Sequence, residues 1–253
     1  GEAGIGKSRL VQVLKEHVSQ APDAWLTECH CSPYHTNSAF YPVIDLFEGA
    51  TLGFAQEDSA EERLNKLEGF LVQYGFPLNE TAPLFAVLFS IPLPDDRYPP
   101  LNLTPQRQKQ KTMEALLTIL LQRAAQQPVL LVIEDLHWVD PSTQELLDLI
   151  INQVPTHRIL DVFTFRPDFH PLWPPRSHIT PVSLTRLSNQ QVKLMAHRIT
   201  SGKSLPAEML EQVATKSDGV PLFVEELTQM ILGSGILRET GDCYELTEPL
   251  SSL

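Results

Sequence analysis

The first eight residues constrain the fold of this chain more than any other segment. They read GEAGIGKS and match the pattern G-x-x-x-x-G-K-[ST] in full. In such a loop, glycines let backbone N–H groups face phosphate oxygens, the lysine neutralises the β- and γ-phosphates, and the serine hydroxyl can bind Mg²⁺. Apolar residues at helical spacing over 7–20 place a helix N-terminus at the loop, which further favours an anion. Taken alone, the segment could also be a glycine-rich turn before a helix.

We therefore expect a nucleotide site at the start of the chain. The residues expected to contact the nucleotide are Gly1, Glu2, Ala3, Gly4, Ile5, Gly6, Lys7, Ser8 and Arg9. Ser8 is also an expected ligand of Mg²⁺.

A second motif is an apolar run that ends in two acidic residues. Residues 129–133 are all apolar, Pro128 precedes them, and Glu134 and Asp135 follow. Such a run is typical of a strand buried on both faces of a parallel sheet. Both carboxylates should then lie at the carboxyl edge of the sheet, where open α/β sheets bind ligands. One acid can hold Mg²⁺ through water and the other can orient or deprotonate an attacking water; the alternative is an acidic turn after a core strand.

Further patterns outline an α/β half followed by a helical half. Strands are expected over residues 24–31, 129–134, 159–165 and 179–184. Three helical segments follow Ser188, and Gly241-Asp242 separates two β-like runs in the manner of a hairpin. Residues 83–100 are expected to form a helical turn and then a loop. Three helix starts carry capping signals, in the pairs Ser59 and Glu62, Thr104 and Pro105, and Asp140 and Pro141.

The charge balance limits the partners of this segment. Its 19 basic and 31 acidic residues give a net charge of −12, which argues against contact with nucleic acid or an anionic membrane. The longest apolar stretch, residues 83–94, is too short to span a bilayer and contains prolines. Three cysteines and no recognisable signal peptide favour a reducing, cytoplasmic location. With no initiating Met and no strand before the loop, we expect an internal piece of a longer protein.

Other residues are candidates for the site. Arg166 ends the strand expected over 159–165 and could sense the γ-phosphate, or it could be a surface residue that closes the strand. Pro221 follows Gly219 at a helix start, and this capping role can coexist with a contact to adenine. His137 and Trp138 could line the site, although such a pair more often packs the loop.

A group of cysteines and histidines resembles a metal cluster only loosely. Alternation along a strand would place Cys29 and Cys31 on one face and His30 on the other. His35 lies nearby in the sequence, but there is no second cysteine pair. We therefore interpret the two cysteines as core thiols rather than as zinc ligands.

Together, these segments resemble the ATPase module of the STAND signalling class within the AAA+ proteins, the origin-recognition-like AAA domain. More narrowly, the chain is similar to the module found behind class III adenylate/guanylate cyclase domains in multidomain bacterial regulators. The resemblance covers essentially the whole chain. It rests on GEAGIGKSRL, CSPYHTNSAFYPVIDLF, LTPQRQKQKTMEALL, LLVIEDLHWVDPSTQELL, TFRPDFHPLWPPRSHIT and DGVPLFVEELTQMILGSGIL. The first, fourth and last of these are the most specific.

The resemblance implies an α/β fold, the three-layer P-loop NTPase of ASCE type, whose parallel sheet here lacks its first strand, followed by a small helical lid. The implied domains are the ATPase core at 1–185, the lid at 186–237, and a hairpin or linker at 238–253 toward a further domain.

The resemblance also implies roles by matching position. Lys7 and Ser8 are the Walker A pair, and Glu134 and Asp135 are the Walker B pair. Arg166 is the sensor at the tip of a strand and acts with the two acids in catalysis, while Pro221 is the lid residue near the base. Glu134 departs from the family, which usually has aspartate as the Mg²⁺ residue, and its contact with the ion is expected to pass through water. No arginine finger can be assigned.

The implied function is a switch that binds ATP and Mg²⁺ and hydrolyses ATP slowly, in a protein with an adenylate/guanylate cyclase output. Its expected partners are ATP and other domains of the same parent chain, with self-association left open. Two alternatives remain: the ATPase module of a LuxR-type transcription regulator, and a non-hydrolytic scaffold.

Overall fold

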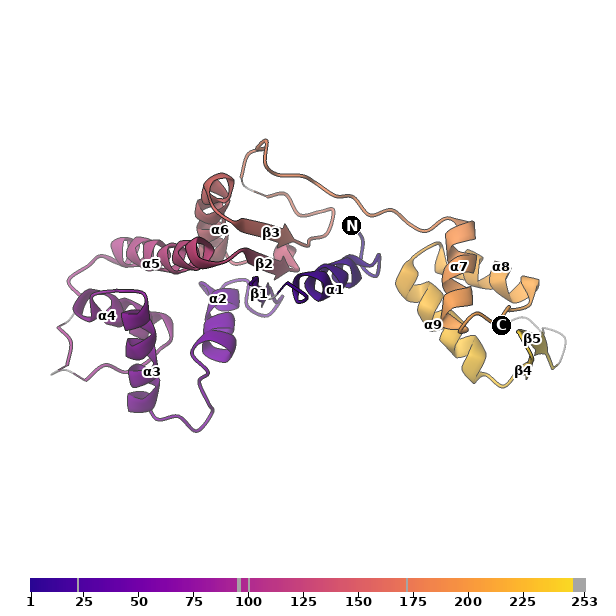
Figure 1. The fold of residues 1–253 in the computed structure, drawn as a ribbon, viewed down its shortest axis with the longest axis horizontal. Helices are drawn as coiled ribbons and strands as arrows, with labels where there is room; N and C mark the ends of the chain where they lie inside the picture. The colour runs from indigo at the N-terminus through magenta and orange to yellow at the C-terminus, as the bar shows by residue number, and fades with distance from the viewer. Residues whose placement is uncertain (22, 95–96, 100, 172, 248–253) are drawn as a thin grey trace. The chain divides into compact units, whose positions relative to one another are not determined.

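A parallel sheet of three strands organises residues 11–179 in the computed structural model, which describes residues 1–21, 23–94, 97–99, 101–171 and 173–247 (Figure 1). The strand order is β1(Trp25–His30), β2(Val129–Glu134), β3(Ile159–Phe163). Every residue of β2 is buried, as expected for a strand with a neighbour on each edge and helices over both faces. This α/β core confirms the expected parallel sheet. The implied loss of a first strand and the lid assignment remain predictions.

Two apolar layers cover the sheet because successive side chains of a strand point to opposite faces. On one face, Leu130 and Val132 pack against Val11 of α1(Lys7–Val18). On the other face, Leu131 and Ile133 belong to the largest core cluster. The helices that contribute buried residues to that cluster include α2(Tyr41–Leu46), α5(Pro105–Gln126) and α6(Pro141–Gln153).

A helical insertion between β1 and α5 packs through aromatic rings. It consists of the π-helical turn η1(Phe47–Thr51), α3(Ala60–Gln73) and α4(Leu78–Leu88). The ring of Phe47 lies 5.8 Å from that of Phe70 and 5.9 Å from that of Phe89, centroid to centroid. Such offset and edge contacts stabilise a core beyond the area they bury.

Residues 83–100 were expected to form a helical turn and then a loop; the helical part is longer than expected, because α4 begins at Leu78 and continues through Pro83 to Leu88. A proline inside a helix removes one backbone hydrogen bond and costs about 3 kcal/mol. Its neighbours Ala82, Leu84 and Phe85 are all buried in the main core. Burial of these side chains offsets the cost, so tertiary packing overrides the local signal.

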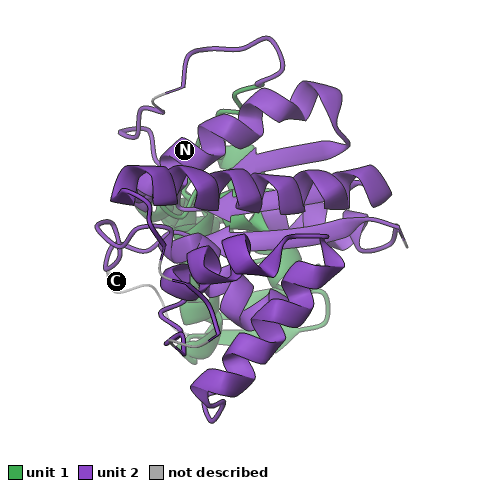
Figure 2. Ribbon diagram, turned by 90° about the vertical axis from the view of Figure 1, so that its left-hand side faces the viewer, with its two compact units in different colours: residues 1–10, 180–253 green, residues 11–179 purple. Residues whose placement is uncertain are grey.

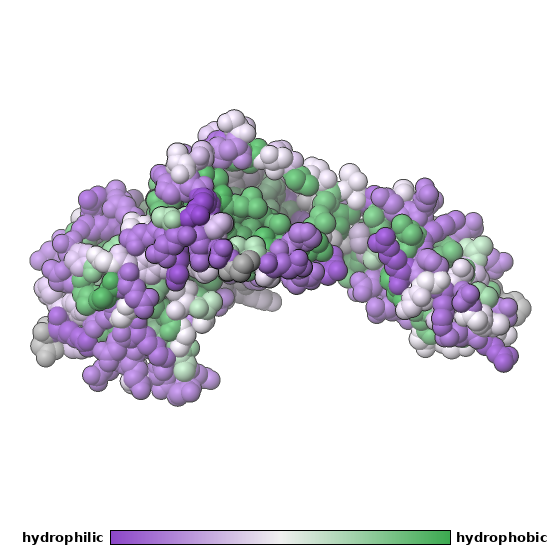
Figure 3. Space-filling view, viewed as in Figure 1, coloured by the Kyte–Doolittle hydropathy of each residue, from purple (hydrophilic) through white to green (hydrophobic). Residues whose placement is uncertain are grey.

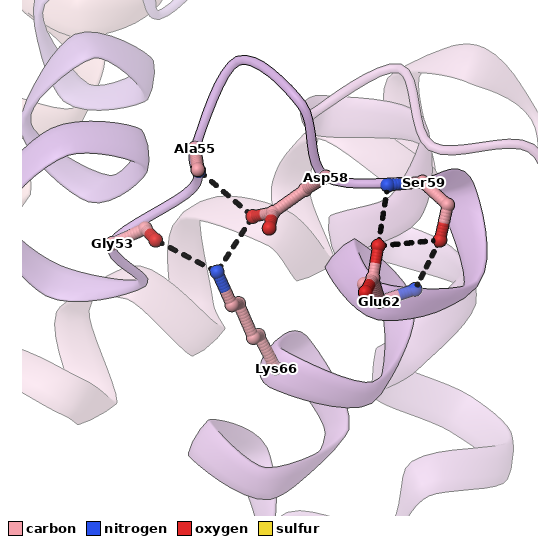
Figure 4. Close-up of polar contacts among 6 residues, drawn as sticks. All are labelled: Gly53, Ala55, Asp58, Ser59, Glu62 and Lys66. Carbon is pink, nitrogen blue, oxygen red and sulfur yellow. Dashed lines mark hydrogen bonds and ion pairs between the residues drawn. The ribbon is translucent and has the colours of Figure 1, made fainter.

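The start of α3 carries the expected capping box (Figure 4). The Ser59 hydroxyl accepts a bond from the N–H of Glu62, and the Glu62 carboxylate accepts one from the N–H of Ser59. Beside it, Asp58 accepts hydrogen bonds from the N–H of Ala55 and the Lys66 ammonium. The bond from Lys66 is the main cause that lowers the pKa of Asp58. The caps expected at Thr104 and Asp140 are also confirmed.

The expectation of a strand over 179–184 is wrong, because the structure shows irregular backbone there. Pro181 has no N–H to donate to a ladder, and no strand among the described residues pairs with this segment. Because no described strand pairs with its outer side, β3 is an edge of the described sheet, and its residue Leu160 is 53% exposed. On the face drawn in Figure 3, hydrophobic residues gather over the region of β2 and β3, whereas hydrophilic residues cover most of α3.

Asp161 of β3 is a buried acid. Although the residue as a whole is half-buried, both carboxylate oxygens are buried and lack a hydrogen-bond partner among the described residues. Burial raises the pKa of this carboxyl to about 7. Because the folded pKa lies above the ordinary value, the protonated acid is favoured in the folded state. Its contribution to stability is present at low pH and is lost as pH rises through about 7.

We expect Asp161→Asn to flatten this dependence. Urea unfolding between pH 4 and 8 should show the wild type losing up to about 4 kcal/mol that the variant keeps, since one pKa unit corresponds to about 1.4 kcal/mol. Asp23→Asn, at an exposed position, is the control and should follow the wild type. If the free energy of unfolding changes with pH equally in the wild type and in Asp161→Asn, the raised pKa of Asp161 is contradicted.

Three helices and a hairpin form most of the second unit, which comprises residues 1–10 and 180–253 (Figure 2). The helices are α7(Asn189–Ile199), α8(Ala207–Ser217) and α9(Pro221–Gly233). They bury a small core that includes Val192, Met209 and Val224. The expected hairpin at Gly241-Asp242 is confirmed by antiparallel β4(Leu237–Thr240) and β5(Cys243–Leu246).

The division between these units falls at 179/180, and residues 1–10 group with the C-terminal helices. The expected domains, 1–185, 186–237 and 238–253, remain predictions, and residues 248–253 lie outside the described residues. None of the helices in the described residues is both long and apolar enough to cross a membrane.

Candidate nucleotide site

The glycines of the first loop adopt the backbone conformation that the motif requires. Gly4 has φ +71° and Gly6 has φ +98°, values that residues with a side chain rarely adopt. The carbonyl of Gly6 accepts the first helical bond of α1, from the N–H of Leu10 at 3.1 Å. The loop therefore leads directly into a helix N-terminus, the arrangement that favours an anion.

Lys7 folds back over the same loop. Its ammonium donates to the carbonyl oxygens of Gly1 at 3.0 Å and Glu2 at 2.8 Å. The side chain is partly buried, so its positive charge is held beside the backbone that precedes it.

The structure brings Pro221 close to this loop, in the same unit. The N–H of Leu222, in the first turn of α9, donates to the carbonyl oxygen of Gly4 at 3.2 Å. A Cβ on Gly4 would lie 3.0 Å from the Cβ of Leu222, so the two segments approach too closely for a larger residue without adjustment. Pro221 pre-sets the first helical turn, as expected from its sequence position.

Arg186 ties the loop to the turn before α9. Its guanidinium donates to the carboxylate of Glu2, at 3.0 and 3.2 Å, and to that of Asp218. The bond to Glu2 is the main cause that raises the pKa of Arg186. All three side chains are exposed, so the energetic contribution of the ion pairs is small. Next to them, the carbonyl oxygen of Gly219 accepts a bond from the N–H of Leu187.

The two acids lie at the carboxyl end of β2, in residues 11–179. Glu134 is the last residue of the strand and is 7% exposed. Asp135 adopts a left-handed conformation with φ 56°, and its side chain is 42% exposed. A turn thus starts immediately after the strand and gives the Asp135 carboxylate access to solvent.

Thr164 holds this turn in place. The N–H of Asp135 donates to the Thr164 hydroxyl at 3.0 Å, and the N–H of Leu136 donates to the Thr164 carbonyl oxygen at 2.8 Å. The N–H of Thr164 in turn donates to the carbonyl oxygen of Ile133. The chain after β3 therefore fixes the backbone of Asp135, a role that sequence reasoning missed. The available signal was its position directly after the neighbouring strand.

Arg166 lies beside the same turn. The central carbon of its guanidinium is 5.1 Å from the centre of the Trp138 ring, a cation–π distance. The ring of Trp138 lies 4.2 Å from that of His137, centroid to centroid, at a tilt of 40°, and the side chain of His137 is 7% exposed. His137 therefore packs the loop, as expected for such a pair. The structure places Arg166 in the unit that carries the two acids, and its sensor role remains a prediction.

Cys29 and Cys31 are core thiols, as expected. Both are buried and free, and His30 between them is exposed. Burial raises the pKa of each thiol to about 12. Neutral thiols are poor nucleophiles, which agrees with a packing role for both cysteines.

The loop and the acids lie in different units: Lys7 and Ser8 belong to residues 1–10, whereas Glu134, Asp135 and Arg166 belong to residues 11–179. Within its unit the structure brings the loop and Pro221 together, and within the other it brings the acids close to Arg166.

Comparison with known proteins shows the family. The model of the AAA ATPase domain matches residues 1–162, which include both the first loop and the two acids. The chain belongs to this family.

An uncharacterized protein of Rhizobium meliloti (strain 1021) is 25% identical over an alignment of 241 residues that covers 91% of this chain. The matched part is 22% of that relative, so the chain spans about a fifth of its length. No solved structure matches the chain significantly.

Proposed function

We propose that this chain binds ATP with Mg²⁺ and hydrolyses it slowly, as a regulatory switch within a longer protein. The observation that carries the proposal is the first loop, with Gly4 and Gly6 left-handed directly before α1. Membership in the AAA ATPase family supports nucleotide binding, because the match covers both motifs. The length of the bacterial relative supports a module within a multidomain chain.

Each residue has a proposed role. Lys7 neutralises the β- and γ-phosphates, and Ser8 and Glu134 hold Mg²⁺, which supplies further positive charge when bound. Asp135 orients the attacking water, and Arg166 senses the γ-phosphate. Pro221 contacts the base, so that α9 can transmit the nucleotide state to neighbouring domains. The signalling class, and an adenylate/guanylate cyclase as the output, rest on the sequence resemblance.

Calorimetric titration of the 253-residue chain with ATP tests the proposal. We expect one ATP per chain, tighter with Mg²⁺ than with a chelator present. Phosphate release should be below roughly 1 s⁻¹, the low end for ordinary enzymes. Saturable binding without any phosphate release would favour a non-hydrolytic scaffold. No saturable binding at millimolar ATP would refute the proposal.

A further inference from the structure

Three metal-ligating side chains meet at the carboxyl ends of β1 and β2. The Nε2 atom of His30 lies 3.6 Å from Oε1 of Glu28 and 3.9 Å from Oε1 of Glu134. One donor atom from each residue lies within 4.8 Å of the other two. Ligands of a tetrahedral zinc ion lie about 3.4 Å apart, given metal–ligand distances near 2.1 Å. The three donor atoms are therefore within a small side-chain adjustment of zinc geometry.

The sheet itself places these donors. Glu28 and His30 are two residues apart on β1, so they share one face. The parallel register sets His30 beside Glu134 on β2, and the N–H of Cys31 donates to the carbonyl oxygen of Glu134 at 3.0 Å. Donors on paired strands keep their spacing better than donors on loops do.

Lys15 of α1 orients the first carboxylate. Its ammonium pairs with Oε2 of Glu28, while Oε1 of Glu28 is the atom nearest His30. The two carboxylates carry two negative charges, and the Lys15 ammonium offsets that of Glu28. A divalent cation would therefore be attracted to the cluster, although Lys15 reduces that attraction.

Burial and donor type favour a particular class of ion. The side chains of Glu28 and Glu134 are 19% and 9% exposed, whereas that of His30 is 62% exposed, so an ion can enter from solvent. Mg²⁺ takes oxygen ligands, while an imidazole with carboxylates suits zinc. We propose that Glu28, His30 and Glu134 form a Zn²⁺ site.

The site would also regulate the module, a consequence that rests on the proposed function. Glu134 is the residue expected to hold Mg²⁺ through water. A zinc ion bound directly to its carboxylate would remove it from that role, so zinc should inhibit ATP hydrolysis.

Calorimetric titration of the untagged chain with ZnCl₂, without nucleotide, tests the site directly. We expect one Zn²⁺ per wild-type chain. His30→Ala and Glu28→Gln should each weaken binding by at least about tenfold, since even a second-shell partner of a metal contributes that much. His17→Ala, at an exposed position on α1, is the matched control and should bind as the wild type does. Thermal melts of each variant verify that it is folded.

Zinc binding that is unchanged in both His30→Ala and Glu28→Gln, or absent from the wild type, would overturn the site. Binding of MnCl₂ but not ZnCl₂ would overturn the assignment to zinc.

Two further measurements separate this inference from the proposed function. Lys7→Ala should keep zinc binding while it loses ATP binding. Zinc should slow phosphate release by the wild type but not by His30→Ala, which lies outside the proposed catalytic residues. Zinc binding through the three residues in a chain that fails to bind ATP would leave the site standing and refute the proposed function. Equal inhibition of the wild type and His30→Ala would refute the regulatory role.

Discussion

Lys7→Ala is expected to weaken the binding of ATP–Mg²⁺ by about a hundredfold or more. The ammonium now donates to the carbonyl oxygens of Gly1 and Glu2, and a bound nucleotide would offer phosphate oxygens instead. Charge-assisted hydrogen bonds contribute about 1.5–3 kcal/mol each. Loss of two of them corresponds to roughly 3 kcal/mol, or a factor of about 100 in affinity. Calorimetric titration with ATP and Mg²⁺ measures this change.

Lys193→Ala is the matched control, because Lys193 is an exposed lysine on α7. It should keep the wild-type affinity. Since Lys7 also bonds to its own loop, the melting temperature of Lys7→Ala must be compared with that of the wild type, to separate lost phosphate contacts from a loosened loop. Unchanged affinity in a folded Lys7→Ala would remove the loop from the site and favour the scaffold alternative.

Asp135→Asn is expected to lower the rate of ATP hydrolysis by about a hundredfold or more and to leave ATP affinity near that of the wild type. Asparagine tolerates the left-handed backbone found at this position, and the N–H bond to Thr164 is kept. The substitution therefore removes the carboxylate charge and little else. General-base or water-orienting groups contribute about 10²- to 10⁴-fold to a rate. Single-turnover phosphate release and calorimetry measure the two quantities separately.

Asp168→Asn, in the exposed segment after β3, is the control and should hydrolyse ATP at the wild-type rate. Glu134→Gln should lower the rate of hydrolysis at least as strongly and should also shift its Mg²⁺ dependence, because the proposed role of Glu134 is to hold the ion. Wild-type hydrolysis by Asp135→Asn would end its assignment as the water-orienting acid.

The parts of the fold that follow from local patterns were predictable. The five apolar residues before Glu134 predicted β2, because few other structures bury every residue of such a short run. The capping box at Ser59 and the caps at Thr104 and Asp140 were predictable because each uses a side chain that bonds within its own first turn. The positive φ angles of Gly4 and Gly6 and the helix start at Pro221 were also predictable, because they follow from the backbone preferences of glycine and proline themselves.

Features that depend on partners distant in sequence were not predictable. The helix through Pro83 depends on core contacts that no local rule contains. The prediction of a strand at 179–184 was wrong, because an apolar segment forms a strand only where another strand pairs with it. The pairing of Arg186 with Glu2, residues that lie 184 positions apart, carries no sequence signal. The triad of Glu28, His30 and Glu134 needed the register of two strands, which the individual strand predictions did not include.

Arg186 has a mechanical consequence. Its guanidinium pairs with Glu2 in the first loop and with Asp218 at the end of α8. The N–H of Leu222, at the start of α9, donates to the carbonyl oxygen of Gly4. These contacts join three separate stretches of chain within one unit, although the exposed ion pairs contribute little to the free energy of unfolding. A shift of the first loop would therefore be passed on to α9 chiefly through the backbone hydrogen bond between Leu222 and Gly4.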